Sequence, residues 1–235
     1  MKIEIWSDVM CPFCYIGKRR FEDALQQFAH KDEVEVEWKS FQLNPDMKTD
    51  PNLNINQYLA DIKGWNLDYA QQMNSHVTEM AAQVGLQYDF DKAIVANSFN
   101  AHRLSHLAKK HGLGAAAEEA LFKAYFTEGK NIDDKDTLTD LGISIGLKGD
   151  DVKETLDSND YADAVKHDIA EAQYLGISGV PFFVMNNKYG VSGAQAVPVF
   201  SETLEKSFAE WQRENDKPKL TIIEGESCTP DGDCG

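Results

Sequence analysis

The sequence is poor in basic residues, in long apolar runs and in cysteine. It has 23 lysines and arginines against 39 aspartates and glutamates, so its net charge is −16 and we expect no nucleic acid partner. No apolar run approaches the roughly 18 residues that span a bilayer, so we expect no membrane partner. Glu4 and Asp8 interrupt the opening, where a signal peptide needs an apolar stretch of about 7–15 residues. The sequence therefore predicts a cytoplasmic protein.

Only four cysteines are present, and Cys11 and Cys14 lie three positions apart near the start. In a cytoplasmic protein such a close pair is more often catalytic or metal-binding than structural. The other two, Cys228 and Cys234, lie near the end of the sequence. With 235 residues, 42% of them hydrophobic, the chain can bury a substantial core, either as one large domain or as a compact domain with an insertion.

The first forty residues predict a strand, a helix and a second strand. Residues 1–6 alternate apolar and polar side chains, which is typical of a half-buried strand. From Cys11 the apolar residues recur at helical spacing, and Pro12 suits the first turn of a helix. Residues 34–38 alternate again and predict the second strand.

The middle of the chain predicts a block of helices. Nearly every segment from about residue 56 to Gly176 has helical periodicity, and several glycines, Gly149 among them, fall where helices are expected to end. Residues 87–90 are the one short stretch expected to be extended. Residues 181–191 predict a hairpin, and a helix is expected to follow over residues 200–211.

This order predicts an α/β domain with an insertion. We expect residues 1–50 and 177–220 to form the α/β domain and residues 51–176 to form a helical insertion. Residues 221–235 are predicted to be a flexible acidic tail that carries a cysteine pair.

The position of the first cysteine pair predicts thiol chemistry. A cysteine at the N-terminus of a helix faces free backbone N–H groups and the positive end of the helix dipole, and both favour the thiolate. We expect Cys11 to occupy this position and to act as the nucleophile. Cys14 lies about one turn further in, so we expect it to be more enclosed and to resolve the mixed disulfide. Asp8, just before the pair, is expected either to tune Cys11 or to hold the loop.

Two other interpretations of the pair are open. The first is a zinc site in which Cys228 and Cys234, or histidines, supply the remaining ligands. The spacing of that second pair is loose for a zinc knuckle, and Pro12 favours a helix start over a knuckle turn. The second is an inert pair buried in a core. We expect neither, and we predict no metal site.

Four segments resemble the DsbA-like branch of the thioredoxin superfamily. Residues 7–14, with the motif Cys-Pro-Phe-Cys, are similar to its active-site opening, and residues 179–184 are similar to its Val–cis-Pro loop. Residues 41–45 and 192–195 resemble the FrnE subgroup, whose members are cytoplasmic. The resemblance covers the chain to about Trp211. It implies an α/β thioredoxin fold with a large all-helical insertion, and a dithiol–disulfide oxidoreductase that acts on protein or peptide disulfides.

The resemblance also implies roles for single residues. The Val180–Pro181 bond would be cis, face Cys11 and present backbone groups to a bound polypeptide. The redox-active disulfide Cys11–Cys14 would stand in place of a bound cofactor. Phe13 occupies the position at which the strongly oxidising periplasmic enzyme has a histidine that stabilises the thiolate. We therefore expect Cys11 to be less acidic, and the potential to be less oxidising, than in that enzyme.

Two further predictions lie outside the motif. Cys228 and Cys234 resemble the extra C-terminal pair of some FrnE-like proteins, and they form either a second redox pair or a tail without a role. Asn97, His102 and Arg103 lie in a stretch similar to a recurrent family segment. These three residues are expected either to face the active-site groove or to cap a helix and make ordinary polar contacts.

Two other functions fit parts of the sequence. Kappa-type glutathione transferases and 2-hydroxychromene-2-carboxylate isomerases share the inserted-helix fold, but they typically carry serine in place of Cys11 and lack the resolving thiol. The presence of both cysteines argues against this alternative, although glutathione is still a candidate co-substrate near Val180 and Pro181. The third possibility is a chaperone-like binder that uses the insertion groove without catalysis.

Overall fold

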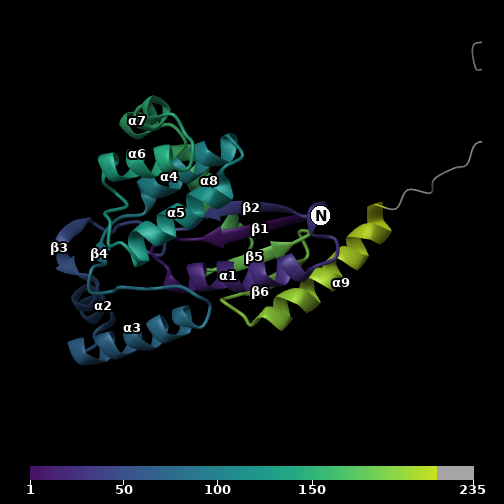
Figure 1. The fold of residues 1–235 in the computed structure, drawn as a ribbon, viewed down its shortest axis with the longest axis horizontal. Coiled ribbons are helices and arrows are strands. Elements are labelled where there is room, and N and C mark those ends of the chain that lie inside the picture. The colour runs from purple at the N-terminus through teal and green to yellow at the C-terminus, as the bar shows by residue number, and fades with distance from the viewer. Residues whose placement is uncertain (216–235) are drawn as a thin grey trace, which may run out of the picture.

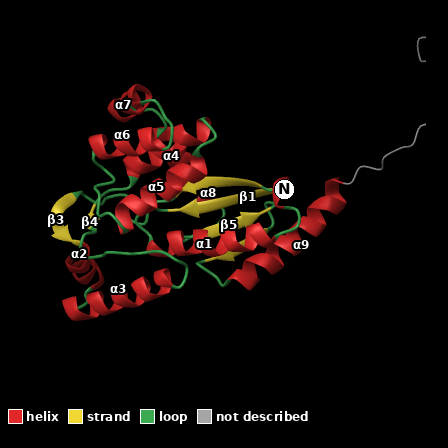
Figure 2. Cartoon of the chain, viewed as in Figure 1, coloured by secondary structure: helices red, strands yellow, loops and turns green. Residues whose placement is uncertain are grey.

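A four-stranded mixed sheet forms the centre of the molecule in the computed structural model, which describes residues 1–215 (Figures 1 and 2). The strand order is β2-β1-β5-β6. β1 pairs in parallel with β2 and antiparallel with β5, and β5 pairs antiparallel with β6. The strands and the helices outside the insertion are β1 (Lys2–Ser7), α1 (Pro12–Gln27), β2 (Glu35–Ser40), β5 (Phe182–Met185), β6 (Tyr189–Ser192) and α9 (Val197–Asn215), with a short 3₁₀ turn at Lys31–Glu33.

The two faces of the sheet receive alternate side chains of β1. Ile5 lies in the layer that α1 and α9 cover. Phe21, Phe183 and Phe200 pack there as tilted and edge-to-face pairs, with ring centroids 4.7–5.8 Å apart. Trp6 points to the opposite face, where α8 covers the sheet, and its indole N–H donates to a backbone carbonyl of α8 at 2.9 Å. The alternation predicts a half-buried strand, but β1 is buried on both faces, because α8 and the segment after it cover the face that carries Trp6.

The chain between β2 and β5 forms the insertion. Its elements in chain order are β3 (Asp50–Asn54), α2 (Ile55–Lys63), α3 (Leu67–Ala82), β4 (Ile94–Val95), α4 (Phe99–Lys110), α5 (Gly114–Phe126), α6 (Lys135–Ser144), α7 (Gly149–Asp157) and α8 (Ala162–Tyr174). The predicted α/β fold with a helical insertion is confirmed, and the helix expected over residues 200–211 is α9, which extends beyond that range at both ends.

The insertion is not all-helical, which corrects one part of the prediction. β3 and β4 form a small antiparallel ladder with an irregular register, whereas residues 87–90, which were expected to be extended, form no strand. β3 is polar and contains Pro51, so it lacks the alternating apolar pattern by which a strand is predicted. Gly149 also differs from expectation: it begins α7, while Gly176, with φ of +74°, follows the end of α8.

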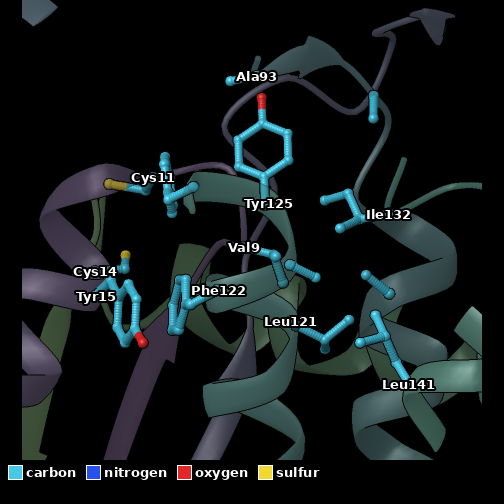
Figure 3. Close-up of a cluster of buried hydrophobic side chains, with 14 of the residues drawn as sticks. Val9, Cys11, Cys14, Tyr15, Ala93, Leu121, Phe122, Tyr125, Ile132 and Leu141 are labelled. Atoms are coloured by element: carbon cyan, nitrogen blue, oxygen red, sulfur yellow. The ribbon is translucent and has the colours of Figure 1, made fainter. Parts of the chain in front are cut away.

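The insertion lies over the end of the sheet at which β1 finishes and α1 begins (Figure 1). One hydrophobic cluster joins the insertion to the start of α1: Val9 and Ile16, from the turn and helix after β1, pack with Leu121 and Phe122 of α5 (Figure 3). The sheet packs under α1 and α9 in a separate cluster. Among the helices of residues 1–215, none combines the length and apolar character that crossing a membrane requires. The domain boundaries drawn from the sequence stay a prediction.

Candidate active site

The turn between β1 and α1 places the first cysteine at the start of the helix. The backbone carbonyl of Asp8 accepts a hydrogen bond from the Cys11 N–H at 2.9 Å, which closes the turn. Cys11 is the N-cap of α1, with extended backbone angles, and Pro12 is the first helical residue. Pro12 loses nothing there because the first N–H groups of a helix have no partner within the helix.

Both thiols are free and both are buried, with Cys11 4% and Cys14 1% exposed. The predicted difference in enclosure is therefore small. Burial raises the pKa of the Cys14 thiol well above its ordinary value, and its hydrogen bond with Cys11 raises it further, although Asp8 and Ser7 act in the opposite direction. In Figure 3 the Cys11 sulfur points away from the hydrophobic cluster, while Cys14 lies beside Tyr15.

The loop before β5 lies directly against the first thiol. The Val180–Pro181 peptide bond is cis, and the Val180 carbonyl oxygen is 3.4 Å from Cys11 Sγ. Gly17 of α1 faces the same loop, since a Cβ at this position would lie 2.9 Å from Pro181 Cγ. Sequence reasoning did not identify Gly17, because the contact joins residues far apart in the chain.

Exposed apolar side chains lie in the cysteine motif and in the segment bonded to Asp8, and a groove lies beside the loop that contacts Cys11. Phe13 is 39% and Leu43 51% exposed. A groove of about 460 Å³ runs beside the segments that precede Val180 and follow β2, and its lining is mostly apolar: Phe41, Gln42, Pro45, Ile169, Gln173, Gly176, Ile177 and Ser178. An extended apolar polypeptide would find both surface and backbone partners here.

Asp8 is fully buried and holds the turn to the segment after β2. Its carboxylate accepts hydrogen bonds from the Met10 N–H at 3.3 Å and the Leu43 N–H at 2.8 Å. Of the two roles predicted for Asp8, holding the loop is the one that these contacts describe.

A cluster of charged and aromatic side chains ties α1 to α5. Tyr15 donates its hydroxyl to Glu119 at 2.6 Å, and Lys18 and Arg19 both pair with the same carboxylate, Lys18 at 2.7 Å. Burial alone would raise the pKa of Glu119, but hydrogen bonds from Arg19, Lys18 and Tyr15 lower it to about 2. Glu119 is about a hundred residues from its partners in sequence, so no local sequence pattern predicts this contact.

Tyr88 makes a second link between the insertion and the catalytic helix. Its hydroxyl donates to the Pro12 carbonyl at 2.7 Å, and its ring stacks on Phe126 with centroids 4.7 Å apart. The insertion therefore contacts the cysteine motif itself.

Asn97, His102 and Arg103, which were predicted either to face the groove or to make ordinary polar contacts, lie in different environments. Asn97 lines a polar groove beside Gln42, and its amide donates to the backbone carbonyls of Pro45 and Met47. His102 and Arg103 do not face a groove, which corrects that prediction: they are 2% and 4% exposed.

Arg103 is turned into the insertion. Its guanidinium donates to the backbone carbonyls of Thr155, Ser158 and Asp160 near the end of α7. His102 lies beside Asp8, with 3.6 Å between Nε2 and Oδ1. Both therefore have the ordinary polar contacts that were the alternative expectation, because α4 is buried on nearly all sides.

Within residues 1–215, no group of three or more histidine, cysteine, aspartate or glutamate side chains has the arrangement of a metal site. Cys228 and Cys234 lie outside the described residues, so the predictions of a second redox pair and of a zinc site that includes them are not addressed by this geometry.

Comparison with known proteins gives a consistent family. A family model described as "DSBA-like thioredoxin domain" matches residues 2–205. Protein YwbO of Bacillus subtilis (strain 168), which is uncharacterized, is 31% identical over 208 residues, which are 86% of this chain and 94% of that protein. A probable DsbA oxidoreductase from Streptomyces coelicolor, known from its crystal structure, is 38% identical with a TM-score of 0.84, and the match covers 100% of this chain and 98% of that one.

Two more distant structures share the fold. The cytosolic disulfide reductase DsbM from Pseudomonas aeruginosa is 17% identical with a TM-score of 0.64, over 89% of this chain and 100% of that one. A 2-hydroxychromene-2-carboxylate isomerase is 15% identical with a TM-score of 0.63, over 92% and 98%. The family model and the Bacillus relative, by contrast, match most of the chain by sequence, and on these two matches the protein belongs to the DSBA-like thioredoxin domain family.

Proposed function

We propose that this protein is a dithiol–disulfide oxidoreductase that acts on protein disulfides through Cys11 and Cys14. The observation that carries the proposal is the position of the Cys11 thiol, which lies at the N-terminus of α1 and 3.4 Å from the Val180 carbonyl, with the Cys14 thiol enclosed behind it. A helix N-terminus stabilises a thiolate, and an adjacent backbone carbonyl offers a polypeptide substrate a sequence-tolerant partner.

The reaction proceeds in two exchanges. The Cys11 thiolate attacks one sulfur of a substrate disulfide, the substrate S–S bond breaks, and the other substrate sulfur leaves as a thiolate. The Cys14 thiol then loses its proton, and its thiolate attacks the Cys11 sulfur and releases the second substrate sulfur. Two electrons and the two protons of the cysteines pass to the substrate, and the protein is left with a Cys11–Cys14 disulfide. The reverse sequence oxidises a substrate dithiol.

Burial of Cys14 suits the second step. Because burial raises the pKa of Cys14, this thiol stays protonated until the mixed disulfide is formed, so it does not compete with Cys11 for substrate.

Insulin reduction tests the proposal. Cys11→Ser is expected to abolish turnover, and Cys14→Ser is expected to accumulate a mixed disulfide with the substrate that only added thiol releases. Unchanged turnover in Cys11→Ser would refute the proposal.

Glutathione and the isomerase alternative are tested in the same system. We propose glutathione as a co-substrate that resets the cysteine pair, without a bound cofactor. Because the fold is shared with a 2-hydroxychromene-2-carboxylate isomerase, glutathione-dependent isomerisation is the second candidate function. Isomerase turnover that survives Cys14→Ser would favour it, since that chemistry needs no resolving thiol.

The finer assignment rests on the segments quoted from the sequence. We assign the protein to the FrnE subgroup on residues 41–45 and 192–195, and propose a cytoplasmic location on the same resemblance. Cys228 and Cys234 are proposed as a second redox pair. If a variant with serine at both positions matches the unmodified protein in turnover and in potential, that role is excluded.

A further inference from the structure

Two charged side chains that take no part in the exchange steps lie directly behind the catalytic turn. Asp8 is 0% and His102 2% exposed, and His102 Nε2 lies 3.6 Å from Asp8 Oδ1. This separation is longer than a hydrogen bond, and the contact is an ion pair when His102 is protonated. His102 Nε2 has no hydrogen-bond partner among the described residues. A buried histidine in this state requires an explanation, because desolvation disfavours its charge.

The carboxylate of Asp8 is held close to the nucleophile. Its two oxygens accept the Met10 and Leu43 N–H groups, and the backbone carbonyl of the same residue accepts the Cys11 N–H. A negative charge fixed and desolvated at this place disfavours a second negative charge on the neighbouring sulfur.

The groups around His102 define its charge. The titratable side chains that face Asp8 and His102 are Glu118 and Tyr125 of α5. Lys18 and His106 face Glu118 in turn. Tyr88 faces the two thiols, with Tyr15 and Arg19 beside it. Burial alone would lower the pKa of His102, but Asp8 and then Glu118 raise it above its ordinary value. Burial raises the pKa of Glu118, whose carboxyl accepts the Ser105 hydroxyl at 2.6 Å. The raised pKa of His102 favours its positive form beside the Asp8 carboxylate.

We propose that His102 is a positioning residue whose positive charge compensates Asp8, so that Asp8 can hold the catalytic turn while Cys11 still ionises. The inference rests on the proposed function, since it concerns the nucleophile of that reaction. It assigns to α4 of the insertion an electrostatic role in chemistry that takes place at the sheet.

Charge compensation makes a specific forecast for variants. His102→Gln leaves Asp8 as an uncompensated buried charge, so ionisation of Cys11 shifts to higher pH. Asp8→Asn with His102→Gln removes both charges, so ionisation returns to the wild-type range even though two native side chains are lost. At an effective dielectric near 20, one uncompensated charge changes an ionisation about 12 Å away roughly tenfold, and a nearer one by more.

The experiment follows iodoacetamide alkylation of Cys11 against pH in the reduced full-length protein, with peptide mass spectrometry separating this cysteine from the other three. His102→Gln is expected to raise the pH midpoint by about one unit and to slow alkylation at pH 7 about tenfold. The double variant is expected to restore the midpoint. His106→Gln is the matched control: this histidine is also buried on α4, but the aspartate with which it pairs is Asp168, at 3.0 Å, and not Asp8. It is expected to leave the midpoint unchanged.

Each outcome decides the matter. An unchanged midpoint in His102→Gln, or a double variant no better than the single one, overturns the inference and leaves the pair a packing contact. If His102→Gln does not fold, the double variant carries the test through its pH midpoint and not through its stability, because an amide at position 8 accepts only one of the two N–H groups that the carboxylate accepts. Compensation predicts the wild-type midpoint, and a raised midpoint overturns it. If the wild-type Cys11 reacts no faster than free cysteine, the proposed function fails, and this result is distinct from failure of the compensation.

Discussion

At the scale of single residues, some side chains of the cysteine motif determine reactivity, and its neighbours determine how closely the loop approaches. Cys11 lies at the helix N-terminus and beside the Val180 carbonyl, while Cys14 is enclosed and its thiol pKa is raised by burial. Phe13 projects outward and is 39% exposed, so it contributes surface but no charge. Gly17 has no side chain, and this allows the Pro181 ring to approach α1. Substitutions at Phe13 and Gly17 separate these two contributions.

Phe13→His is expected to make the Cys11–Cys14 pair more oxidising. An imidazole at this position can stabilise the Cys11 thiolate and so the reduced form, and a tenfold stabilisation corresponds to about 30 mV. A glutathione redox titration measures the shift, with Phe13→Gln as the uncharged control. We expect the wild-type potential to lie below the roughly −120 mV of the strong periplasmic oxidant; a value that high, or no shift in Phe13→His, would contradict the prediction.

Gly17→Ala tests the approach of the loop to the helix. Alanine within a helix is normally about 1 kcal/mol more favourable than glycine. Here the added Cβ would lie 2.9 Å from Pro181 Cγ, and overpacking of this kind costs about 1–3 kcal/mol. We therefore expect a net loss of about 1 kcal/mol in the free energy of unfolding, together with slower insulin reduction.

Urea denaturation measures the change, and Gly114→Ala is the control. Gly114 begins α5, and a Cβ there would meet Lys109 at 3.7 Å, which is ordinary contact. If Gly17→Ala proves as stable as Gly114→Ala, the close approach at Pro181 is not a constraint.

At the scale of elements, α1 is held by the insertion at two places as well as by the sheet. Tyr88 donates to the Pro12 carbonyl at the first turn, and Glu119 of α5 gathers Tyr15, Lys18 and Arg19 one and two turns further along. The aromatic stack of Tyr15 on Phe122, with centroids 5.0 Å apart, continues the same contact. The orientation of the catalytic helix therefore depends on α5 and on the segment before β4.

Glu119→Gln is expected to destabilise the protein at neutral pH by about 1 kcal/mol. The side chain is 34% exposed, so solvent screening keeps the loss near the value of a surface network. The pKa of Glu119 is lowered to about 2, so its contribution is present above the ordinary value of 4.5 and is lost as pH falls from about 4.5 towards 2.

The pH dependence provides the measurement. The difference in free energy of unfolding between wild type and Glu119→Gln is expected to be full at pH 7 and to vanish near pH 2. Glu22→Gln, which removes a second partner of Lys18 and Arg19 that is 38% exposed, serves as the control and is expected to have a smaller effect. A difference that stays constant across this range would show that the Glu119 charge makes no contribution.

At the scale of the whole molecule, the insertion shares a hydrophobic core with the start of α1. The cluster that contains Val9 and Ile16 also contains Leu121 and Phe122 of α5 and Leu138 of α6, and Figure 3 shows part of it. The sheet has a second cluster of its own, to which α1 contributes Phe21. Because α1 belongs to both clusters, we expect the insertion and the sheet to unfold cooperatively.

Leu121→Ala is expected to lower the free energy of unfolding by about 2–5 kcal/mol, since Leu121 is 0% exposed. The loss should appear equally in the insertion and in the sheet. Far-ultraviolet circular dichroism, which follows the helices, and fluorescence of a variant that keeps only Trp6, in the sheet, are expected to report one coincident transition, displaced by the same amount. Two separate transitions would mean that the insertion unfolds on its own.

The sequence alone determined the features that depend on neighbouring residues. Alternation predicted β1 and β2, helical spacing predicted α1 and the insertion helices, and Pro12 predicted a helix start that places Cys11 at the N-cap. These signals are local because side-chain periodicity and capping act within a few positions. They were sufficient for the fold class and for the position of the cysteine pair.

Only the tertiary structure decided which distant residues meet. The pairing of Asp8 with His102, the contact of Tyr88 with Pro12 and the burial of Arg103 join segments tens of residues apart. β3 and β4 were missed for the same reason, since a short polar strand exists only through its partner. Contacts of this kind depend on how helices and loops pack around a common core. The sequence of one segment therefore does not indicate which distant segment it contacts.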